Sequence, residues 1–186
     1  MRPATPGCPD VRAGSRWRAV RSWQQRPLPD PAAGPEATWR GDPVSPGDLT
    51  LLRRRLAATL RGSAMPAATD DDVDRLLLAF EELASNGLGH GEAPVQVVVT
   101  IAAAGWLLVV SDAAVDRPPR TAVGRDAATG GLGLYMVARM AAAHGWVVHA
   151  GRKHVRARID VSAARPQQDG GAHLQPRSGA PSLDRQ

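Results

Sequence analysis

Two polar residues, Glu82 and Asn86, stand four positions apart in a stretch whose apolar residues recur with the spacing of a helix. Side chains at positions i and i+4 are neighbours on a helix surface. At about 100° per residue, both lie opposite the apolar stripe, which consists of Val73, Leu76, Leu77, Phe80, Leu83 and Ala84. A carboxylate and an amide held together near a glycine-rich helix end could serve a metal–phosphate site. An isolated pair of this kind is more typical of a solvated polar face.

The same stretch predicts the central helix of the fold, from Val73 to Gly91. The sequence TDDDVD at positions 69–74 supplies an N-cap and acidic side chains for the positive end of the helix dipole. Because one face of this helix is apolar and the other polar, the remaining elements are expected to pack on the apolar face, which leaves the polar face to a ligand or to solvent.

A second candidate site is the glycine-rich segment that runs directly into a predicted helix over residues 134–144. Glycines before a helix let backbone amides approach an anion, and the helix dipole favours the negative charge. Such a segment also occurs where a chain only turns, so phosphate binding and a simple turn both remain open. Before it lies a loop from Asp112 to Thr129; loops of this length are usually functional or disordered, and a lid over a ligand is one interpretation. The glycine-rich segment consists of Gly130, Gly131, Leu132, Gly133 and Leu134.

Two strands follow the central helix, at 95–101 and 106–111, and the short glycine-containing turn between them predicts an antiparallel hairpin. Further strands are expected at 146–150 and 153–161. In the last strand apolar and polar residues alternate, which predicts a buried face and a basic, exposed face. With a first helix over 48–61, we expect an α+β fold. It is a two-layer sandwich in which helices cover one face of a mixed, mostly antiparallel sheet.

Length and composition predict one domain, residues 44–161, between two disordered ends. Residues 1–43 are rich in Arg, Pro and Gly, and residues 162–186 in Pro, Gly, Gln and Ser. Within the first extension, residues 37–40 could add a short edge strand to the sheet. Its tryptophans alternate with arginines, which is compatible with stacking on bases, with binding a partner, or with a low-complexity extension. These tryptophans are Trp17, Trp23 and Trp39.

The charge distribution weakens a role of the domain in nucleic-acid binding. The chain has a formal charge of +5, but residues 1–40 carry seven Arg against three acidic residues, whereas residues 41–161 carry thirteen basic and thirteen acidic residues. The single cysteine, Cys8, allows no intramolecular disulfide. No apolar run reaches the ~18 residues of a membrane span, and the N-terminus has no apolar signal segment. A cytoplasmic location without membrane contact is therefore expected.

The order of these features resembles the Bergerat-type ATP-binding fold shared by histidine kinases and gyrase. Within that fold the chain is similar to the bacterial anti-sigma-factor serine kinases, regulators of the RsbW kind, and the resemblance covers about residues 44–161. The family's N box, E-L-x-x-N-x-x-x-H-G, is matched at positions 82–91 by Glu82, Leu83, Asn86, His90 and Gly91.

The resemblance implies roles for these residues. Asn86 is implied to bind Mg²⁺, whose other ligands would be phosphate oxygens and waters, and oxygen ligands suit this ion. Glu82 is implied to be the general base for an attacking hydroxyl or water. His90 would lie beside the phosphates or simply help to end the helix, and Asp112 would accept a hydrogen bond from the adenine amino group. The glycine-rich segment from Gly130 to Leu134 would hold the polyphosphate.

Three positions depart from the family pattern. Ala114 stands where the family often has glycine, which puts the backbone approach to adenine in question. Gly87 stands where alanine is common and costs the helix ~1 kcal/mol unless the helix ends there. His154 stands where threonine is often found in the last hairpin, so a hydrogen bond near the adenine would be missing.

The implied function is that of an ATP- and Mg²⁺-dependent serine/threonine kinase that phosphorylates an anti-sigma-factor antagonist and binds a sigma factor. One of three arginines of the expected lid, Arg117, Arg120 or Arg125, would offset the charge of the γ-phosphate. The alternatives are a catalytically weak or inactive ATP-binding module that sequesters its partner, and a scaffold or nucleic-acid binder that acts through its tails. Dimerisation is common in the family, so a homodimer is one expected state, although the sequence reveals no interface.

Overall fold

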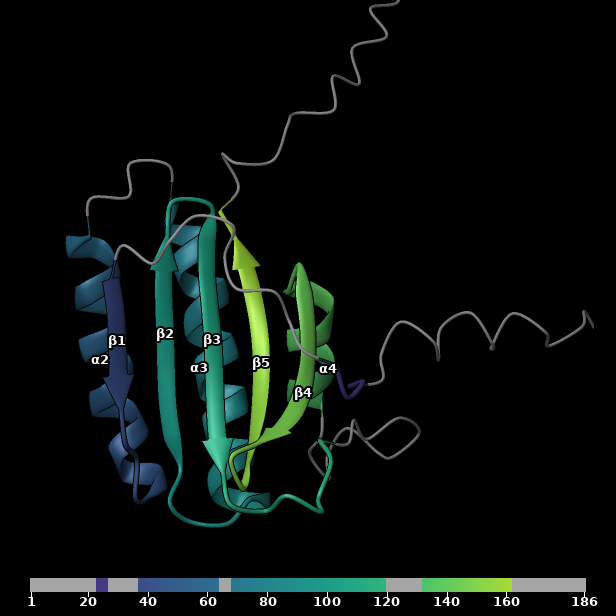
Figure 1. The fold of residues 1–186 in the computed structure, drawn as a ribbon. Coiled ribbons are helices and arrows are strands. Elements are labelled where there is room, and N and C mark those ends of the chain that lie inside the picture. Colours follow the sequence, from purple (N-terminus) through teal and green to yellow (C-terminus); the bar gives the residue numbers. More distant parts are fainter. Residues whose placement is uncertain (1–22, 27–36, 64–67, 120–131, 162–186) are drawn as a thin grey trace, which may run out of the picture.

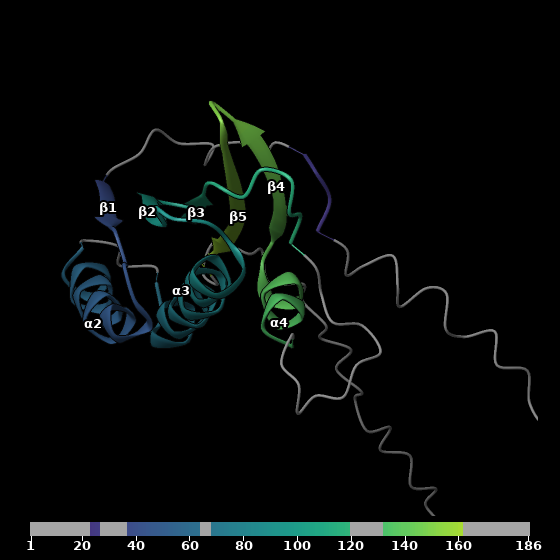
Figure 2. The same ribbon diagram turned by 90° about the horizontal axis from the view of Figure 1, so that it is seen from below.

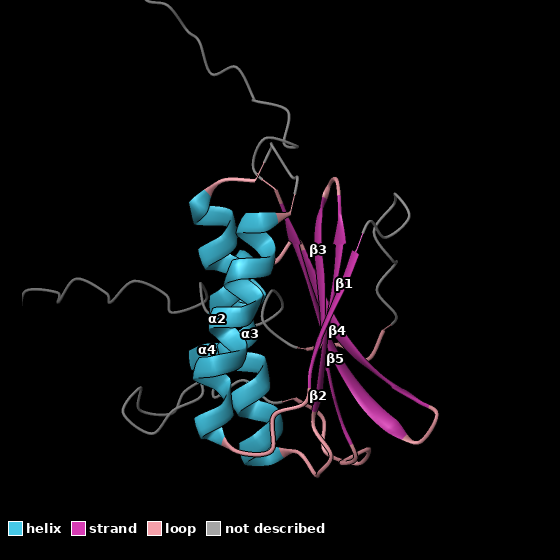
Figure 3. Cartoon of the chain, turned by 90° about the vertical axis from the view of Figure 1, so that its left-hand side faces the viewer, coloured by secondary structure: helices cyan, strands magenta, loops and turns pink. Residues whose placement is uncertain are grey.

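The structure, a computed structural model, describes residues 23–26, 37–63, 68–119 and 132–161. Within these ranges five strands form a single antiparallel sheet in the order β1-β2-β3-β5-β4, and three helices cover one of its faces (Figures 1 and 2). Seen from the side, helices and sheet form two layers (Figure 3). The elements are β1 Ala37–Gly41, α2 Pro46–Gly62, α3 Asp70–His90, β2 Gln96–Ala102, β3 Gly105–Asp112, α4 Leu132–Met140, β4 Ala143–His149 and β5 Arg152–Asp160. The predicted α+β sandwich is confirmed.

Helix α3 lies between α2 and α4 in the helical layer (Figure 2). It begins with a reciprocal cap, because the Thr69 hydroxyl accepts a hydrogen bond from the Asp72 amide at 3.2 Å while the Asp72 carboxylate accepts one from the Thr69 amide at 3.0 Å. This arrangement satisfies two backbone donors that a helix start would leave unpaired. The prediction of a central helix with an N-cap in this acidic stretch is confirmed, and the helix starts three residues earlier than expected.

Successive side chains of a strand point to opposite faces of the sheet. The predicted β2–β3 hairpin is confirmed, with Ala102 opposite Gly105 across a tight turn. Gly105 has φ +147°, and a Cβ at this position would collide with the carbonyl oxygen of Ile159 on the next strand, so glycine is required here. In β5 buried residues alternate with half-buried ones along the whole strand, so the predicted buried face is confirmed, whereas the basic face expected to be exposed is half-buried. The core lies between the helices and the inner sheet face, and its largest fully buried side chains include Trp106, Phe80, Leu108 and Ile159.

The boundary between α4 and β4 corrects the prediction. The sequence pattern predicted a helix up to His144 and a strand from Trp146, but α4 ends at Met140 and β4 begins at Ala143. The run of alanines before His144 favours a helix locally. His144 instead pairs with Ala157 in the β4–β5 ladder, so strand pairing overrides the local propensity.

Two segments of the N-terminal extension belong to the folded part, and the expectation of disorder over 1–43 is wrong for them. β1 pairs with the edge of β2, which confirms the edge strand predicted at 37–40, and the Trp39 side chain is buried. Trp23 is also buried, against β4. Trp17, the rest of the extension and the expected tail at 162–186 lie outside the described residues.

Candidate functional site

Glu82 of α3 lies directly against Gly133 in the first turn of α4. A Cβ built on Gly133 would collide with Oε2 and Cδ of Glu82 and would lie 3.1 Å from its Cγ. Only glycine leaves room for the carboxylate at this point. The structure therefore brings the acidic residue of one motif to the glycine-rich segment of the other. Gly130 and Gly131 lie outside the described residues.

The surroundings of Glu82 make it a stronger base than an ordinary glutamate. Its side chain is half-buried, and this burial raises its pKa above the usual value of 4.5, with a further rise from the negative charge of Glu81. A carboxyl group with a raised pKa binds a proton more readily once it is ionised. Its position against the start of α4 places this base beside backbone amides and a helix dipole that favour anions.

The other polar residues of the N box follow along α3 toward its C-terminus. Asn86 lies one turn after Glu82 and is half-buried, while His90 is the last residue of the helix and is exposed. Gly87 faces the sheet, where a Cβ would lie 3.2 Å from Val95 and 3.3 Å from Val110. The helix continues past Gly87 to His90, so this glycine does not end the helix but lets it pack closely on β3.

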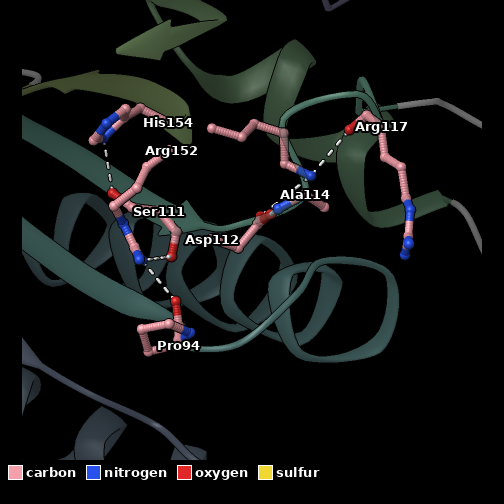
Figure 4. Close-up of polar contacts among 8 residues, drawn as sticks. Pro94, Ser111, Asp112, Ala114, Arg117, Arg152 and His154 are labelled. Atoms are coloured by element: carbon pink, nitrogen blue, oxygen red, sulfur yellow. Dashed lines mark hydrogen bonds and ion pairs between the residues drawn. The ribbon is translucent and has the colours of Figure 1, made fainter. Parts of the chain in front are cut away.

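Asp112 ends β3 and is only 1 % exposed. Its Oδ1 accepts a hydrogen bond from the Ala114 amide at 2.9 Å (Figure 4), and its Oδ2 lies 3.2 Å from Nζ of Lys153. A Cβ on Gly91 would lie 2.7 Å from Cγ of Asp112, so the carboxyl group packs on the end of α3. Glu82 and Gly91 are nine residues apart, about 13 Å along a helix. Glu82 therefore lies near the middle of α3 and Asp112 at its C-terminal end, and the two carboxylates define the two ends of the candidate site.

Lys153 is a functional candidate that the sequence reasoning missed. It lies directly opposite Asp112 in the β3–β5 ladder, is only 3 % exposed, and donates a second hydrogen bond to the carbonyl oxygen of Arg117 at 3.0 Å. The signal was present in the sequence, because Lys153 has the same strand parity as the apolar residues Val155 and Ala157. A lysine on a buried face almost always has a partner.

His154 lies on the outer face of the sheet and not beside Asp112. Its Nδ1 is 2.8 Å from the Ser111 hydroxyl and its Nε2 is 3.3 Å from the carbonyl oxygen of His149. Burial lowers the pKa of His154, which favours the neutral ring. Successive residues of a strand point to opposite faces. His154 therefore lies on the sheet face away from Asp112, whereas Lys153 faces Asp112. The missing hydrogen bond near the adenine stays a prediction.

The first residues of the expected lid form hydrogen bonds with Asp112 and Lys153. Ala114, one of the departures from the family pattern, is buried, and its amide is already used by Asp112. The Arg117 backbone holds Lys153, but its side chain is exposed and points away from Asp112 (Figure 4). Arg120 and Arg125 lie outside the described residues.

The comparison with protein families agrees with this geometry. A family model described as the histidine kinase-like ATPase domain matches residues 43–159. The chain belongs to this family. Comparison with curated proteins gave no match. For the histidine kinase-like ATPase family the implied ligand is ATP, and the fold expected from the resemblance is confirmed. Among the described helices of this ATPase domain, none combines the length and apolar character needed to cross a membrane.

The residues at the Glu82 end of the ATPase domain fit a nucleotide with a divalent cation. The absence of a Cβ at Gly133 makes room for the Glu82 carboxylate beside the first turn of α4, and Asn86 one turn further along α3 offers a side-chain oxygen, the kind of donor that Mg²⁺ prefers. In the described part of the chain no three His, Cys, Asp or Glu side chains cluster as a metal site. The family resemblance implies that a Mg²⁺ ion here would take its remaining ligands from phosphate and water.

The Asp112 end has the right acceptor for an adenine amino group, but that acceptor is covered. One oxygen of Asp112 is held by Ala114 and the other faces Lys153, so little of the carboxylate meets solvent. A base can reach it only when the contacts of Lys153 or of residues 113–117 rearrange. The residues at the Glu82 end thus fit phosphate and Mg²⁺ in the observed arrangement, whereas Asp112 can bind an adenine only after its present contacts rearrange.

Proposed function

We propose that this chain is an ATP- and Mg²⁺-dependent serine/threonine protein kinase of the anti-sigma-factor type. It phosphorylates a protein antagonist of an anti-sigma factor and binds a sigma factor. The observation that carries the proposal is the contact of Glu82 with Gly133, which places a carboxylate of raised pKa at the anion-favouring start of α4. Family membership supports the ATP-binding half of the proposal.

In this mechanism the chain's own residues position the reactants and move one proton. Glu82 accepts the proton of the attacking serine hydroxyl, and the first turn of α4 holds the polyphosphate. Asn86 would hold Mg²⁺, which neutralises phosphate charge when bound. Asp112 accepts the hydrogen bond of the adenine amino group once its cover has moved. Catalysis of this kind depends mainly on positioning and on charge neutralisation.

Equilibrium binding of ATP, with and without Mg²⁺, tests the first half of the proposal. We expect Mg²⁺ to tighten binding to the wild type, and Asn86→Ala to remove this gain, a loss of roughly tenfold or more for one charge-assisted contact. Ser85→Ala is the matched control, because Ser85 is the exposed neighbour of Asn86 on the same helix. A wild-type protein that binds no Mg-ATP would refute the proposed function.

The role of Glu82 has a pH signature. Glu82→Gln should retain Mg-ATP binding and slow phosphate transfer to the partner by about 10²–10⁴-fold, the usual contribution of a general base. Because the base must be ionised, the wild-type rate should fall as the pH drops through the pKa of Glu82. That pKa is raised, so the fall should begin at a higher pH than for an ordinary glutamate with a pKa of 4.5.

Glu81→Gln provides the matched variant for this profile. It removes the negative charge that helps to raise the pKa of Glu82, so the acid limb of the rate profile should move to lower pH while transfer persists. Equal transfer rates for Glu82→Gln and the wild type would remove Glu82 from the mechanism.

A second function is favoured by the covered state of Asp112. A protein that binds nucleotide weakly, or only to shape its surface, could regulate a sigma factor by sequestration alone. The buried contacts of Asp112 with Lys153 and Ala114 support this alternative. Mg-ATP binding together with no transfer to any co-expressed antagonist would select it over the kinase.

A further inference from the structure

The segment Trp23–Arg26 docks on the free edge of β4, although it lies well before residues 43–159 that match the ATPase family. Gln25 forms a parallel bridge with Trp146. The Arg26 amide donates to the Trp146 carbonyl at 2.9 Å, and the Trp146 amide donates to the Gln24 carbonyl at 3.1 Å. The segment lies beside β4 and near α4 in both views (Figures 1 and 2). It thus extends the sheet at an edge that would otherwise expose unpaired backbone groups.

Side chains lock this short segment in place. Trp23 is 6 % exposed, and its ring lies edge-on to His144 with 4.9 Å between the ring centroids. The indole N–H of Trp146 donates to the carbonyl oxygen of Trp23 at 3.1 Å. The Arg26 guanidinium donates to the carbonyl oxygen of His144 at 3.2 Å. These side-chain contacts hold residues 23–26 in one defined position on β4.

The surface of β4 is shaped to accept the segment. A Cβ on Gly145 would lie 3.1 Å from the Gln24 carbonyl oxygen and 3.1 Å from Cγ of Arg26. These approaches are tighter than ordinary van der Waals contact, so a branched side chain at Gly145 would push the segment away. Glycine at this position therefore allows the close approach.

The same segment reaches the candidate active site through one hydrogen bond. The Trp23 indole N–H donates to the carbonyl oxygen of Leu134 at 3.2 Å, across a sequence separation of 111 residues. Leu134 lies in the first turn of α4 and directly follows Gly133, which contacts Glu82. This hydrogen bond therefore connects residues 23–26 to the first turn of α4. In the proposed function, the position of that turn determines the distance between Glu82 and the phosphate.

We propose that Trp23 is a positioning residue, and that docking of residues 23–26 holds the first turn of α4 in the geometry that binds nucleotide. Docking of the segment and binding of Mg-ATP are then thermodynamically linked, so each strengthens the other by the same factor. The nucleotide half of this proposal rests on the proposed function. The other half of the proposal, that residues 23–26 hold the first turn of α4 in place, rests only on the contacts of Trp23.

Three variants test the proposal on the full-length chain. Trp23→Phe keeps an aromatic ring but removes the N–H donor, Gly145→Val displaces the segment from the opposite side, and Gln25→Ala changes only an exposed side chain and is the control. Hydrogen exchange of the α4 amides is the first readout. We expect exchange to rise about 2–10-fold in Trp23→Phe, the effect of one lost hydrogen bond, to rise further in Gly145→Val, and to stay unchanged in Gln25→Ala.

Mg-ATP affinity is the second readout. We expect Trp23→Phe and Gly145→Val to weaken binding about fivefold or more, at the scale of linked sites. In the wild type, saturating Mg-ATP should slow exchange of the Arg26 and Trp146 amides, an effect that a merely structural role of the segment would not produce.

The outcomes separate the claims. Unchanged α4 exchange in both Trp23→Phe and Gly145→Val would overturn the proposal and leave the segment as a cover for a strand edge. Raised α4 exchange with unchanged Mg-ATP affinity would overturn the linkage. If the wild type binds no Mg-ATP, the proposed function fails, and the exchange comparison still decides whether Trp23 holds α4.

Discussion

Replacement of Lys153 by methionine is expected to lower the free energy of unfolding by about 3–5 kcal/mol, the usual cost of removing one partner from a buried ion pair. Methionine has a similar length, so little volume is lost. Among the described residues, Asp112 would keep only the Ala114 amide as a hydrogen-bond partner while it remains almost fully buried. The expected loss is therefore the cost of a buried, uncompensated carboxylate. Denaturant unfolding of the wild type and the variant measures it.

Two comparisons test this explanation. The double variant Asp112→Asn/Lys153→Met removes both charges and should recover a large part of the lost stability. Arg53→Met breaks the pair with Glu81, which has a shorter N–O distance of 2.8 Å, but the two side chains are 39 % and 44 % exposed. This exposed pair should cost less than about 1 kcal/mol. A loss in Lys153→Met as small as that of Arg53→Met would show that the buried pair has no special role.

Replacement of Gly133 by alanine should nearly abolish phosphate transfer while leaving the fold intact. The added methyl group would occupy the position of the Glu82 carboxylate. That carboxylate is the end of a flexible side chain, so it can swing away at little cost to stability. The general base is then displaced, and the rate loss should approach the ~10²–10⁴-fold expected for Glu82→Gln. Transfer rates and unfolding curves measured on the same preparations test both parts.

Gly89→Ala is the matched control for this change. Gly89 lies near the end of α3, where a Cβ would meet no atom within 4 Å. Alanine should stabilise the helix there by about 0.5–1 kcal/mol and leave transfer unchanged. If Gly133→Ala transfers phosphate at the wild-type rate, Glu82 does not need its observed position, and the proposed mechanism is wrong.

These predictions have a common origin in close approaches between elements that are distant in sequence. Gly133 touches Glu82 from another helix, and Lys153 faces Asp112 from the neighbouring strand. In both cases the residues within a few positions of either partner do not indicate that the two partners are in contact. The order of the motifs suggested that Glu82 and the glycine-rich segment meet, but only through resemblance to a family.

Local patterns predicted the parts of the fold that depend on near neighbours. The apolar spacing of α3 and the cap at Thr69 act within a few residues, and the alternation in β5 repeats every second residue. The same reasoning failed at His144, where three preceding alanines favour a helix but pairing with β5 produces a strand. It also failed at Trp23, because four residues in an Arg- and Pro-rich stretch carry no periodic signal.

The sequence by itself determined the helices, most of the strands, the two-layer architecture, and the shared face of Glu82 and Asn86 on one helix. The tertiary structure alone decided that Gly133 makes room for Glu82, that Lys153 and not His154 faces Asp112, and that Trp23 reaches Leu134. The physical reason is the range of the interactions. Helix caps and strand alternation are set by residues a few positions apart, whereas the contact of Trp23 with Leu134 spans 111 positions and exists only once the layers have packed.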